Sequence, residues 1–302
     1  MRISSIDIGT NTVLLLIADV GRDGTITPIA HGHEIVRLGK GVDRTKNISA
    51  ESIDRLRTVL TEYVAVSRKH HVEKIAACGT SAVREAENRE ALRDLVRKEF
   101  GIELIVLSGR EEAALTYLGA VSDFPGAEHY TVMDIGGGST EVTSGTGTNI
   151  RTSISVPLGC VRLTEQFLTS APPSRETLER VRNVILRELE PVRGFSDEST
   201  LVGVAGTVTT LAALDLQLSE YDPLKVSGHR LSIRVIDEVF ALLSQKTVDE
   251  IRHIPQIHPE RADILLAGVL ILREVMKTFG WREITASDRG LRYGLAMREA
   301  GE

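Results

Sequence analysis

The sequence predicts an α/β protein built from two similar domains, and two observations lead to this prediction. The first is a repeated loop design, in which an apolar strand is followed by an acidic residue, a glycine turn, hydroxyl residues and a second strand. One copy of this loop covers 7–12 and the other covers 134–140. The second observation is the length of 302 residues, because single hydrophobic cores stop growing at roughly 250–300 residues.

Hydrophobic periodicity and turn residues place the elements of the first half. Strands are predicted at 2–8, at 12–20 and near 28–37, which gives a meander around the first loop. Ser49 is the predicted N-cap of a helix over 50–70. The remaining predicted elements are a strand at 73–78, a helix from Thr80 or Ser81 to about 100, a strand at 103–107 and a helix at 109–122. The first domain is therefore expected to hold a mixed sheet of five strands flanked by helices.

The same pattern restarts in the second half. Strands at 129–134, 139–144 and 150–156 form a meander around the second loop. Residues 217–230 have no regular pattern. The other predicted elements are helices at 160–168, 175–193, 207–216, 233–246, 247–253, 259–279 and 289–300, with strands at 201–204 and 283–286. This domain is also expected to have five strands, and the domains are predicted as 1–124 and 125–288.

Composition is that of an ordinary globular chain, with 42% hydrophobic and 26% charged residues. No apolar run reaches the roughly 18 residues of a membrane-spanning helix, and the apolar stretch at 13–20 follows an acidic turn, unlike a secretory signal. A net charge of −6 argues against general nucleic-acid binding. Cys78 and Cys160 lack a pairing pattern, so a reducing cytoplasm is the expected location.

The two glycine loops are suited to a phosphate group. Glycine lets the backbone approach a ligand closely, and consecutive N–H groups in such a turn form an anion-binding concavity. An aspartate, Asp7 or Asp134, stands at the start of each loop, where a carboxylate can hold a divalent cation through water. One Asp-x-Gly is a common turn, but two copies in register are more specific. The repeat therefore predicts two domains that bind one phosphate.

A third glycine element and an arginine are further candidates. Gly203 to Thr207 lies between a predicted strand and a helix, and N–H groups at a helix start suit phosphate. A tight strand-to-helix turn explains this element equally well. Arg84 falls in the first turns of the predicted helix that ends near 100, where the helix dipole disfavours a cation. This position indicates an anion partner, although exposed arginines are common.

Two adjacent carboxylates occur in the segment 108–113. Ser108 and Glu111 have capping-box spacing, which gives Glu111 a structural role. Glu112 has no such role and projects about 100° further round the helix, so it is a candidate general base for water. A solvent-exposed helix glutamate is the alternative. Glu141 follows the second loop on its outgoing strand. It is a candidate to bind a metal ion together with Asp134, and a surface strand residue is the alternative.

In their order and spacing these motifs resemble the exopolyphosphatase / guanosine pentaphosphate phosphohydrolase (Ppx/GppA) family. The resemblance covers nearly the whole chain and is carried by the segments 7–12, 80–86, 108–113, 134–141, 203–207, 261–264 and 287–292. The family belongs to the superfamily of acetate kinase, sugar kinases, heat-shock chaperone ATPases and actin. It implies two ribonuclease-H-like domains with a phosphate cleft between them, and it allows the last helix, about 289–302, to pack back on the first domain.

The resemblance also implies roles for single residues. Glu112 is similar to the family's catalytic base, and Asp134 and Glu141 are similar to the pair that binds Mg²⁺ and positions water. A short two-domain form without the C-terminal helical region of longer members is expected. The candidate phosphate-binding residues are Asp7, Gly9, Thr10, Asn11, Thr12, Arg84, Gly136, Gly137, Gly138, Ser139, Thr140, Gly206 and Thr207.

Three positions depart from the family pattern and bear on substrate preference. Leu14 stands where the family usually has arginine or histidine, Ser227 where it often has the histidine of Val-His-Gly, and Tyr293 where it commonly has the glutamate of Arg-Glu-Gly.

The leading expectation is an exopolyphosphatase that removes terminal phosphate from inorganic polyphosphate with Mg²⁺ or Mn²⁺. Guanosine pentaphosphate hydrolysis to the tetraphosphate is the alternative of the same class. An alternative of a different class is a non-catalytic sensor of an alarmone or of polyphosphate. A sugar or acetate kinase is a less favoured alternative. A homodimer is implied by the resemblance alone, and neither nucleic acid nor a membrane is an expected partner.

Overall fold

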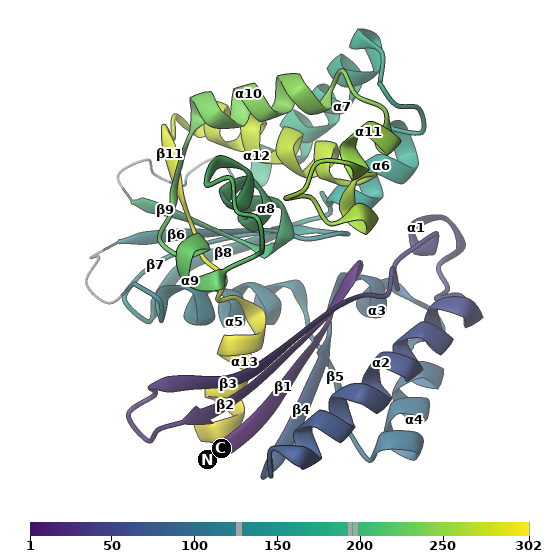
Figure 1. Ribbon diagram of the computed structural model, residues 1–302, viewed down its shortest axis with the longest axis vertical. Coiled ribbons are helices and arrows are strands. Elements are labelled where there is room, and N and C mark those ends of the chain that lie inside the picture. The colour runs from purple at the N-terminus through teal and green to yellow at the C-terminus, as the bar shows by residue number, and fades with distance from the viewer. Residues whose placement is uncertain (125–128, 193–194, 196–198, 302) are drawn as a thin grey trace. The chain divides into compact units, whose positions relative to one another are not determined.

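The computed structural model describes residues 1–124, 129–192, 195 and 199–301. The chain divides into two compact units: unit 1 combines Met1–Gly119 with Gly290–Glu302, and unit 2 is Ala120–Arg289. The predicted boundary at residue 125 falls on 125–128, which lie outside the described residues. Within the described ranges, unit 1 has a sheet of five strands and unit 2 a sheet of six, each with helices packed against it (Figure 1). The predicted α/β class with two mixed sheets is thus confirmed.

The sheet of unit 1 has the strand order β3-β2-β1-β4-β5. Its antiparallel meander consists of β1 (Arg2–Ile8), β2 (Thr12–Val20) and β3 (Ile26–Ile35). Two parallel strands, β4 (Lys74–Gly79) and β5 (Leu104–Val106), extend the sheet beyond β1. The parallel strands place the residues that follow β4 at the same end of the sheet as the glycine loop that follows β1.

Both faces of this sheet are covered by helices, as the strand alternation requires. Ile6 belongs to the cluster that packs on α2 (Ala50–Lys69) and α4 (Arg89–Phe100). Ile3, on the opposite face of β1, packs with α5 (Gly109–Val121) and α13 (Leu291–Gly301). Asp7 has the same parity as Ile3, so its side chain projects on the face covered by α5 and α13.

Glycines bring the backbones of α5 and α13 into contact. A Cβ atom added at Gly294 would lie 1.9 Å from the Leu115 carbonyl oxygen, and one added at Gly119 would lie 2.1 Å from the Gly290 carbonyl oxygen. Real Cβ atoms essentially never come within 3.0 Å of such atoms. These positions therefore require glycine, and the last helix is an integral part of unit 1.

Unit 2 has the strand order β10-β11-β9-β6-β7-β8. The meander β6 (Tyr130–Ile135), β7 (Thr140–Thr146) and β8 (Asn149–Val156) repeats that of unit 1. The parallel strands are β9 (Thr200–Val204) and β11 (Glu283–Ala286). Among the described residues the sheet has one strand more than predicted, the antiparallel β10 (Arg230–Ser232). Three residues are too few to show a period of two.

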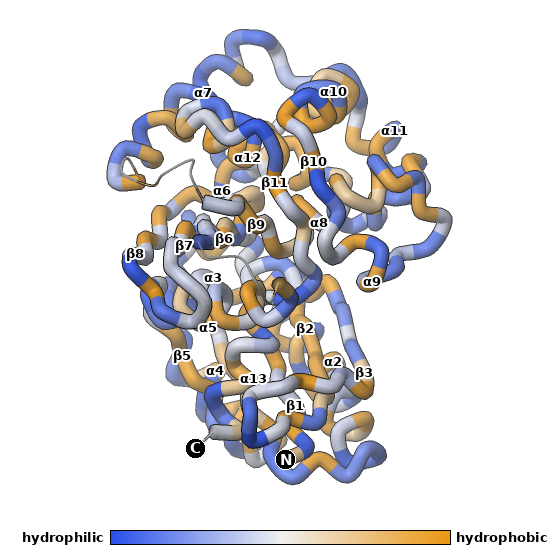
Figure 2. The backbone as a smooth tube through the Cα atoms, turned by 90° about the vertical axis from the view of Figure 1, so that its left-hand side faces the viewer, coloured by the Kyte–Doolittle hydropathy of each residue, from blue (hydrophilic) through white to orange (hydrophobic). Residues whose placement is uncertain are grey.

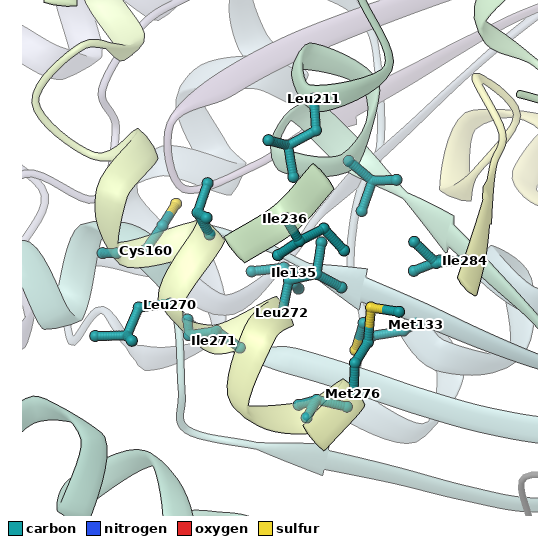
Figure 3. Close-up of a cluster of buried hydrophobic side chains, with 14 of the residues drawn as sticks. Met133, Ile135, Cys160, Leu211, Ile236, Leu270, Ile271, Leu272, Met276 and Ile284 are labelled. Carbon is teal, nitrogen blue, oxygen red and sulfur yellow. The ribbon is translucent and has the colours of Figure 1, made fainter. Parts of the chain in front are cut away.

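The core of unit 2 lies around α12 (Leu265–Phe279), which is buried on most sides. The other described helices of unit 2 are α6 (Cys160–Phe167), α7 (Arg175–Glu188), η1 (Glu190–Val192), α8 (Ala205–Asp215), α9 (Pro223–Val226), α10 (Ile233–Leu243), α11 (Val248–Arg252) and η2 (Pro259–Arg261). Figure 3 shows side chains from α12 meeting those from β6, α6, α8, α10 and β11. The outer helix α7 is amphipathic, and hydrophilic and hydrophobic residues alternate along it in Figure 2.

The helix predicted to run to about residue 100 is instead two helices, α3 (Ser81–Glu85) and α4. The chain between them is held by the segment that follows the short helix α1 (Val42–Thr45). Asn88 exchanges two hydrogen bonds of 2.9 Å with the backbone of Ile48. These contacts are between residues far apart in sequence, so local periodicity could not reveal the break.

Two further predicted helices also differ. The helix predicted at 259–279 is divided into η2 and α12, and α7 ends at Glu188. Residue 193, the predicted end of α7, lies outside the described residues.

Candidate functional site

The glycine loop of unit 1 is closed and held by backbone hydrogen bonds. The Gly9 N–H donates to the Thr12 carbonyl over 3.0 Å, and a Cβ at position 9 would lie 2.9 Å from that oxygen. The Thr10 carbonyl accepts the Gly39 N–H over 2.7 Å, and the Asn11 carbonyl accepts N–H groups from residues 36 and 37. The carbonyl side of the loop is therefore used for its own structure.

Glu112 lies buried beside the end of this sheet. The predicted capping box is present, since the Ser108 N–H donates to Glu111 Oε2 over 2.8 Å and the Glu111 N–H donates to Ser108 Oγ over 3.3 Å. Glu112 is only 7% exposed, so the alternative of a solvent-exposed helix glutamate is wrong. Its Oε2 accepts a hydrogen bond of 2.8 Å from Arg84 Nη1, which also donates to the Leu107 carbonyl.

Burial gives Glu112 the character of a base. Loss of water around the carboxylate raises its pKa, and the charge and hydrogen bond of Arg84, with a hydrogen bond from Thr80, oppose this effect. Burial also raises the pKa of the Cys78 thiol, and the negative charges of Asp7 and Glu112 raise this pKa further. Both carboxylates therefore lie near Cys78, and the thiol is a neutral core residue rather than a nucleophile.

The position of Arg84 within its helix differs from the predicted one. Because α3 ends at Glu85, Arg84 lies in the last turn of a short helix, where the dipole favours a cation. The reason for expecting an anion partner from a first-turn position was therefore wrong. The anion that Arg84 contacts in this structure is Glu112.

In unit 2, Asp134 and Glu141 are direct cross-strand partners on β6 and β7. Residues opposite each other in an antiparallel pair have Cβ atoms about 4.5–5.5 Å apart on one face. Glu141 is 2% exposed, so the surface-residue alternative is wrong, and its Oε1 accepts a 2.7 Å hydrogen bond from Ser155, its partner on β8. Two carboxylates held side by side repel each other unless a cation or a proton joins them.

This pair fits a hard divalent cation. Within the part of the chain that the structure describes, no group of three or more His, Cys, Asp or Glu side chains is arranged to hold a metal. Mg²⁺ characteristically uses one or two carboxylates and completes its coordination with water and substrate phosphates. The two carboxylates therefore match the number that Mg²⁺ commonly uses from a protein.

The corresponding ladder positions of unit 1 carry different chemistry. Asp7 faces Leu14 on β2, and Leu14 faces His33 on β3. Leu14 thus occupies the place that Glu141 has in unit 2. The unit 2 meander thus has a pair of facing carboxylates where the unit 1 meander has one carboxylate facing a leucine.

The loop of unit 2 repeats the design of the first loop. The Gly136 N–H donates to the Ser139 carbonyl over 3.0 Å, the same closure as between Gly9 and Thr12. The Thr140 hydroxyl is buried and donates to the Leu158 carbonyl. Thr140 therefore contributes to the structure of the loop, and its hydroxyl proton is not directed to a ligand.

The third glycine element joins β9 to α8, and here the structure gives a contact to Arg261, which the sequence placed in the family-like segment 261–264 without a role. A Cβ at Gly206 would lie 1.1 Å from Nη1 of Arg261, so the guanidinium rests directly on this glycine. Burial lowers the pKa of Arg261. Val204 pairs with Asp134, so the element leaves the same end of the sheet as the second loop, with Thr207 buried behind it. The contact between residues 206 and 261 has no local spacing that could have predicted it.

The structure thus gathers the predicted residues into two sets. Unit 1 brings Glu112 and Arg84 together beside Asp7 and the loop 9–12. Unit 2 brings Asp134 and Glu141 together at the loop 136–139, with Gly206 and Thr207 in the first turn of α8, directly after the neighbouring strand β9.

Comparison with known proteins decides the family. The model of the Ppx/GppA phosphatase family matches residues 16–302. The chain belongs to the Ppx/GppA family. It is 36% identical over 316 residues to exopolyphosphatase 2 of Mycobacterium tuberculosis, with 99% of each chain covered. It is 32% identical over 305 residues to exopolyphosphatase 1 of the same organism, covering 99% of this chain and 88% of that protein.

Solved structures of Ppx/GppA proteins agree with this assignment. The Aquifex aeolicus family member has a TM-score of 0.85 at 34% identity, covering 99% of this chain and 97% of that chain. An exopolyphosphatase from Cytophaga hutchinsonii has a TM-score of 0.91 at 29% identity, covering 100% and 98%. No helix among the described residues has the length and apolar character needed to cross a membrane.

Two departures from the Ppx/GppA pattern have structural roles here. Ser227 Oγ accepts the Asp288 N–H over 3.0 Å, and the nearby His229 contacts Asp215 over 2.7 Å. Tyr293 is 3% exposed and fills the core of unit 1. Its ring lies 6.4 Å from the His31 ring. Both residues are thus part of the packing of this family member.

Proposed function

We propose that this chain is an exopolyphosphatase that hydrolyses the terminal phosphoanhydride bond of inorganic polyphosphate with Mg²⁺ or Mn²⁺. The observation that carries the proposal is Glu112, a buried carboxylate with a raised pKa that is hydrogen-bonded to Arg84. It lies in the unit that carries the first glycine loop. Two curated Ppx/GppA relatives at 32% and 36% identity are named exopolyphosphatases, which supports this substrate class.

In the proposed reaction Glu112 takes the proton of the attacking water. A base is most effective when its pKa lies near the working pH, and burial moves Glu112 in that direction. Arg84 holds the carboxylate in place, and the loop N–H groups stabilise the charge on the phosphoryl oxygens, which is the largest contribution in such reactions.

Asp134 and Glu141 would hold the cation that the proposed reaction requires. When bound, Mg²⁺ supplies positive charge that neutralises the phosphate oxygens. The proposed phosphate contacts are Gly9, Thr10, Asn11, Thr12, Gly136, Gly137, Gly138, Ser139, Gly206 and Thr207, with Arg84 beside them.

The test compares Glu112→Gln with a matched control, Glu111→Gln. Glutamine at 112 keeps the size of the side chain but cannot take a proton, so the phosphate-release rate should fall about 10²–10⁴-fold. Glu111→Gln alters the adjacent carboxylate, which caps α5 and takes no part in the proposed reaction, and should stay near the parent rate. Near-normal phosphate release by Glu112→Gln would refute the proposed base.

Substrate class is decided in the same assay. Phosphate release is measured from long polyphosphate, short polyphosphate and guanosine pentaphosphate, with and without Mg²⁺. A higher kcat/KM for guanosine pentaphosphate would assign the alternative hydrolase. Tight binding of these compounds without phosphate release would assign a sensor.

A further inference from the structure

The glycine loop of unit 2 is held from one side by the start of α6. The Cys160 N–H donates to the Gly136 carbonyl over 3.0 Å. The N–H groups of Val161 and Arg162 donate to the Gly137 carbonyl over 2.9 and 3.1 Å. The carbonyl oxygens of the loop are thus turned towards the first turn of α6.

A side chain completes this attachment. Nε of Arg162 donates to the Gly138 carbonyl over 2.9 Å. The approach is close, because a Cβ at Gly159 would lie 2.3 Å from the Gly137 oxygen and 2.5 Å from the Gly138 carbonyl carbon. Three successive loop carbonyls, those of residues 136–138, therefore point at α6 and its arginine.

The orientation of these carbonyls fixes the orientation of the loop amides. In a planar trans peptide the C=O of one residue and the N–H of the next point in opposite directions. Carbonyls of 136–138 that point at α6 therefore direct the N–H groups of Gly137, Gly138 and Ser139 away from it. An array of parallel N–H groups is the arrangement that binds an anion.

The first loop is held differently. There the carbonyls of Thr10 and Asn11 accept backbone N–H groups of the segment 36–39. In unit 2 backbone N–H groups hold the carbonyls of Gly136 and Gly137, as in the first loop, but the carbonyl of Gly138 receives a guanidinium. The attachment at Gly138 therefore depends on a side chain that substitution can remove without changing the backbone.

We propose that Arg162 is a positioning residue that keeps the Gly137–Ser139 amides directed at a phosphate oxygen. The part of this proposal that concerns phosphate rests on the proposed function. The part that concerns the loop rests on the hydrogen bonds alone. Removing a charge-assisted hydrogen bond to one carbonyl should weaken anion binding at the loop by about tenfold.

The experiment compares Arg162→Gln with Arg175→Gln in the full chain. Arg175 is the matched control because its side chain is 93% exposed on α7 and pairs with Glu179, so both variants lose one positive charge. Hydrogen–deuterium exchange is measured over residues 136–140, and inorganic tripolyphosphate binding is measured by calorimetry. Arg162→Gln should exchange faster in this segment and bind about tenfold more weakly than Arg175→Gln, with a similar unfolding midpoint.

Two outcomes would overturn the proposal. Equal exchange over 136–140 in the two variants would show that Arg162 does not hold the loop, whatever the activity of the protein. Faster exchange with unchanged tripolyphosphate affinity would show that this loop is not the anion site. Failure of the proposed function is distinguishable, because it appears as a lack of phosphate release in the parent protein, on which the exchange measurement does not depend.

A second pair of variants tests the same contact from the helix side. Gly159→Ala places a Cβ against the Gly137 carbonyl, whereas Gly301→Ala places one in open space. Gly159→Ala should reproduce the faster exchange of the loop, and Gly301→Ala should not. Unchanged exchange in Gly159→Ala would contradict the close packing of α6 on the loop.

Discussion

Replacing Arg84 with glutamine removes the cation that lies against the buried Glu112 carboxylate. The two side chains meet at 2.8 Å, with Glu112 at 9% and Arg84 at 24% side-chain exposure. Burial raises the pKa of Glu112 and Arg84 opposes that rise, so loss of Arg84 raises the pKa further. A carboxyl group whose pKa is higher in the folded than in the unfolded state favours folding when it is protonated. Its stabilising effect is lost as the pH rises through the folded-state pKa.

The expected magnitude therefore depends on pH. Breaking a buried ion pair by removing one partner costs about 3–5 kcal/mol when the remaining charge stays ionised. At acid pH Glu112 takes up a proton, and the cost falls to that of a lost neutral hydrogen bond, about 1 kcal/mol. The destabilisation by Arg84→Gln should thus grow from about 1 kcal/mol at acid pH towards about 3–5 kcal/mol at alkaline pH.

Urea denaturation at several pH values measures this difference. Arg234→Gln is the control, because the Arg234 side chain is 80% exposed and its contact with Glu238 is 3.4 Å long. Its effect should stay within about 0.5 kcal/mol at every pH. In the double variant with Glu112→Gln the pH dependence should vanish. A destabilisation by Arg84→Gln that is the same at acid and alkaline pH would refute the assigned ion pair.

The remaining predictions concern the cation and the last helix. Glu141→Gln should raise the Mg²⁺ concentration for half-maximal phosphate release on the order of tenfold, whereas Glu283→Gln, at a 57% exposed side chain of β11, should not. An unchanged Mg²⁺ titration of Glu141→Gln would remove this residue from the cation site. Gly294→Ala should lower the free energy of unfolding by about 1–3 kcal/mol through overpacking against Leu115, measured by circular dichroism in urea with Gly301→Ala as control. Equal stability of these two glycine variants would contradict the close contact of α5 and α13.

The sequence predicted the sheets well because their strands alternate clearly and are bounded by turn residues. The meanders around the loops at 7 and 134 were found in this way. The break between α3 and α4 was missed because Asn88 is held by Ile48, a contact that no local pattern contains. The strand β10 was missed because it is three residues long.

Part of the candidate site could be predicted, because the spacing of neighbouring residues gave them different roles. Glu112 was selected because the capping box occupies Glu111, and the structure contains that capping box. The argument for Arg84 failed because it assumed a helix that continues to residue 100. Arg162 and Arg261 contact glycines that are distant in sequence, so these contacts exist only in the folded chain.

The cross-strand rows of the two meanders hold different residues at equivalent positions. Asp134, Glu141 and Ser155 occupy the same ladder positions as Asp7, Leu14 and His33, yet the first row can attract a metal ion and the second has a single carboxylate. The two meanders share one strand arrangement, but these rows differ in charge. A chimera with the 130–156 meander in both units would keep the strand arrangement, and the two rows would no longer differ in charge.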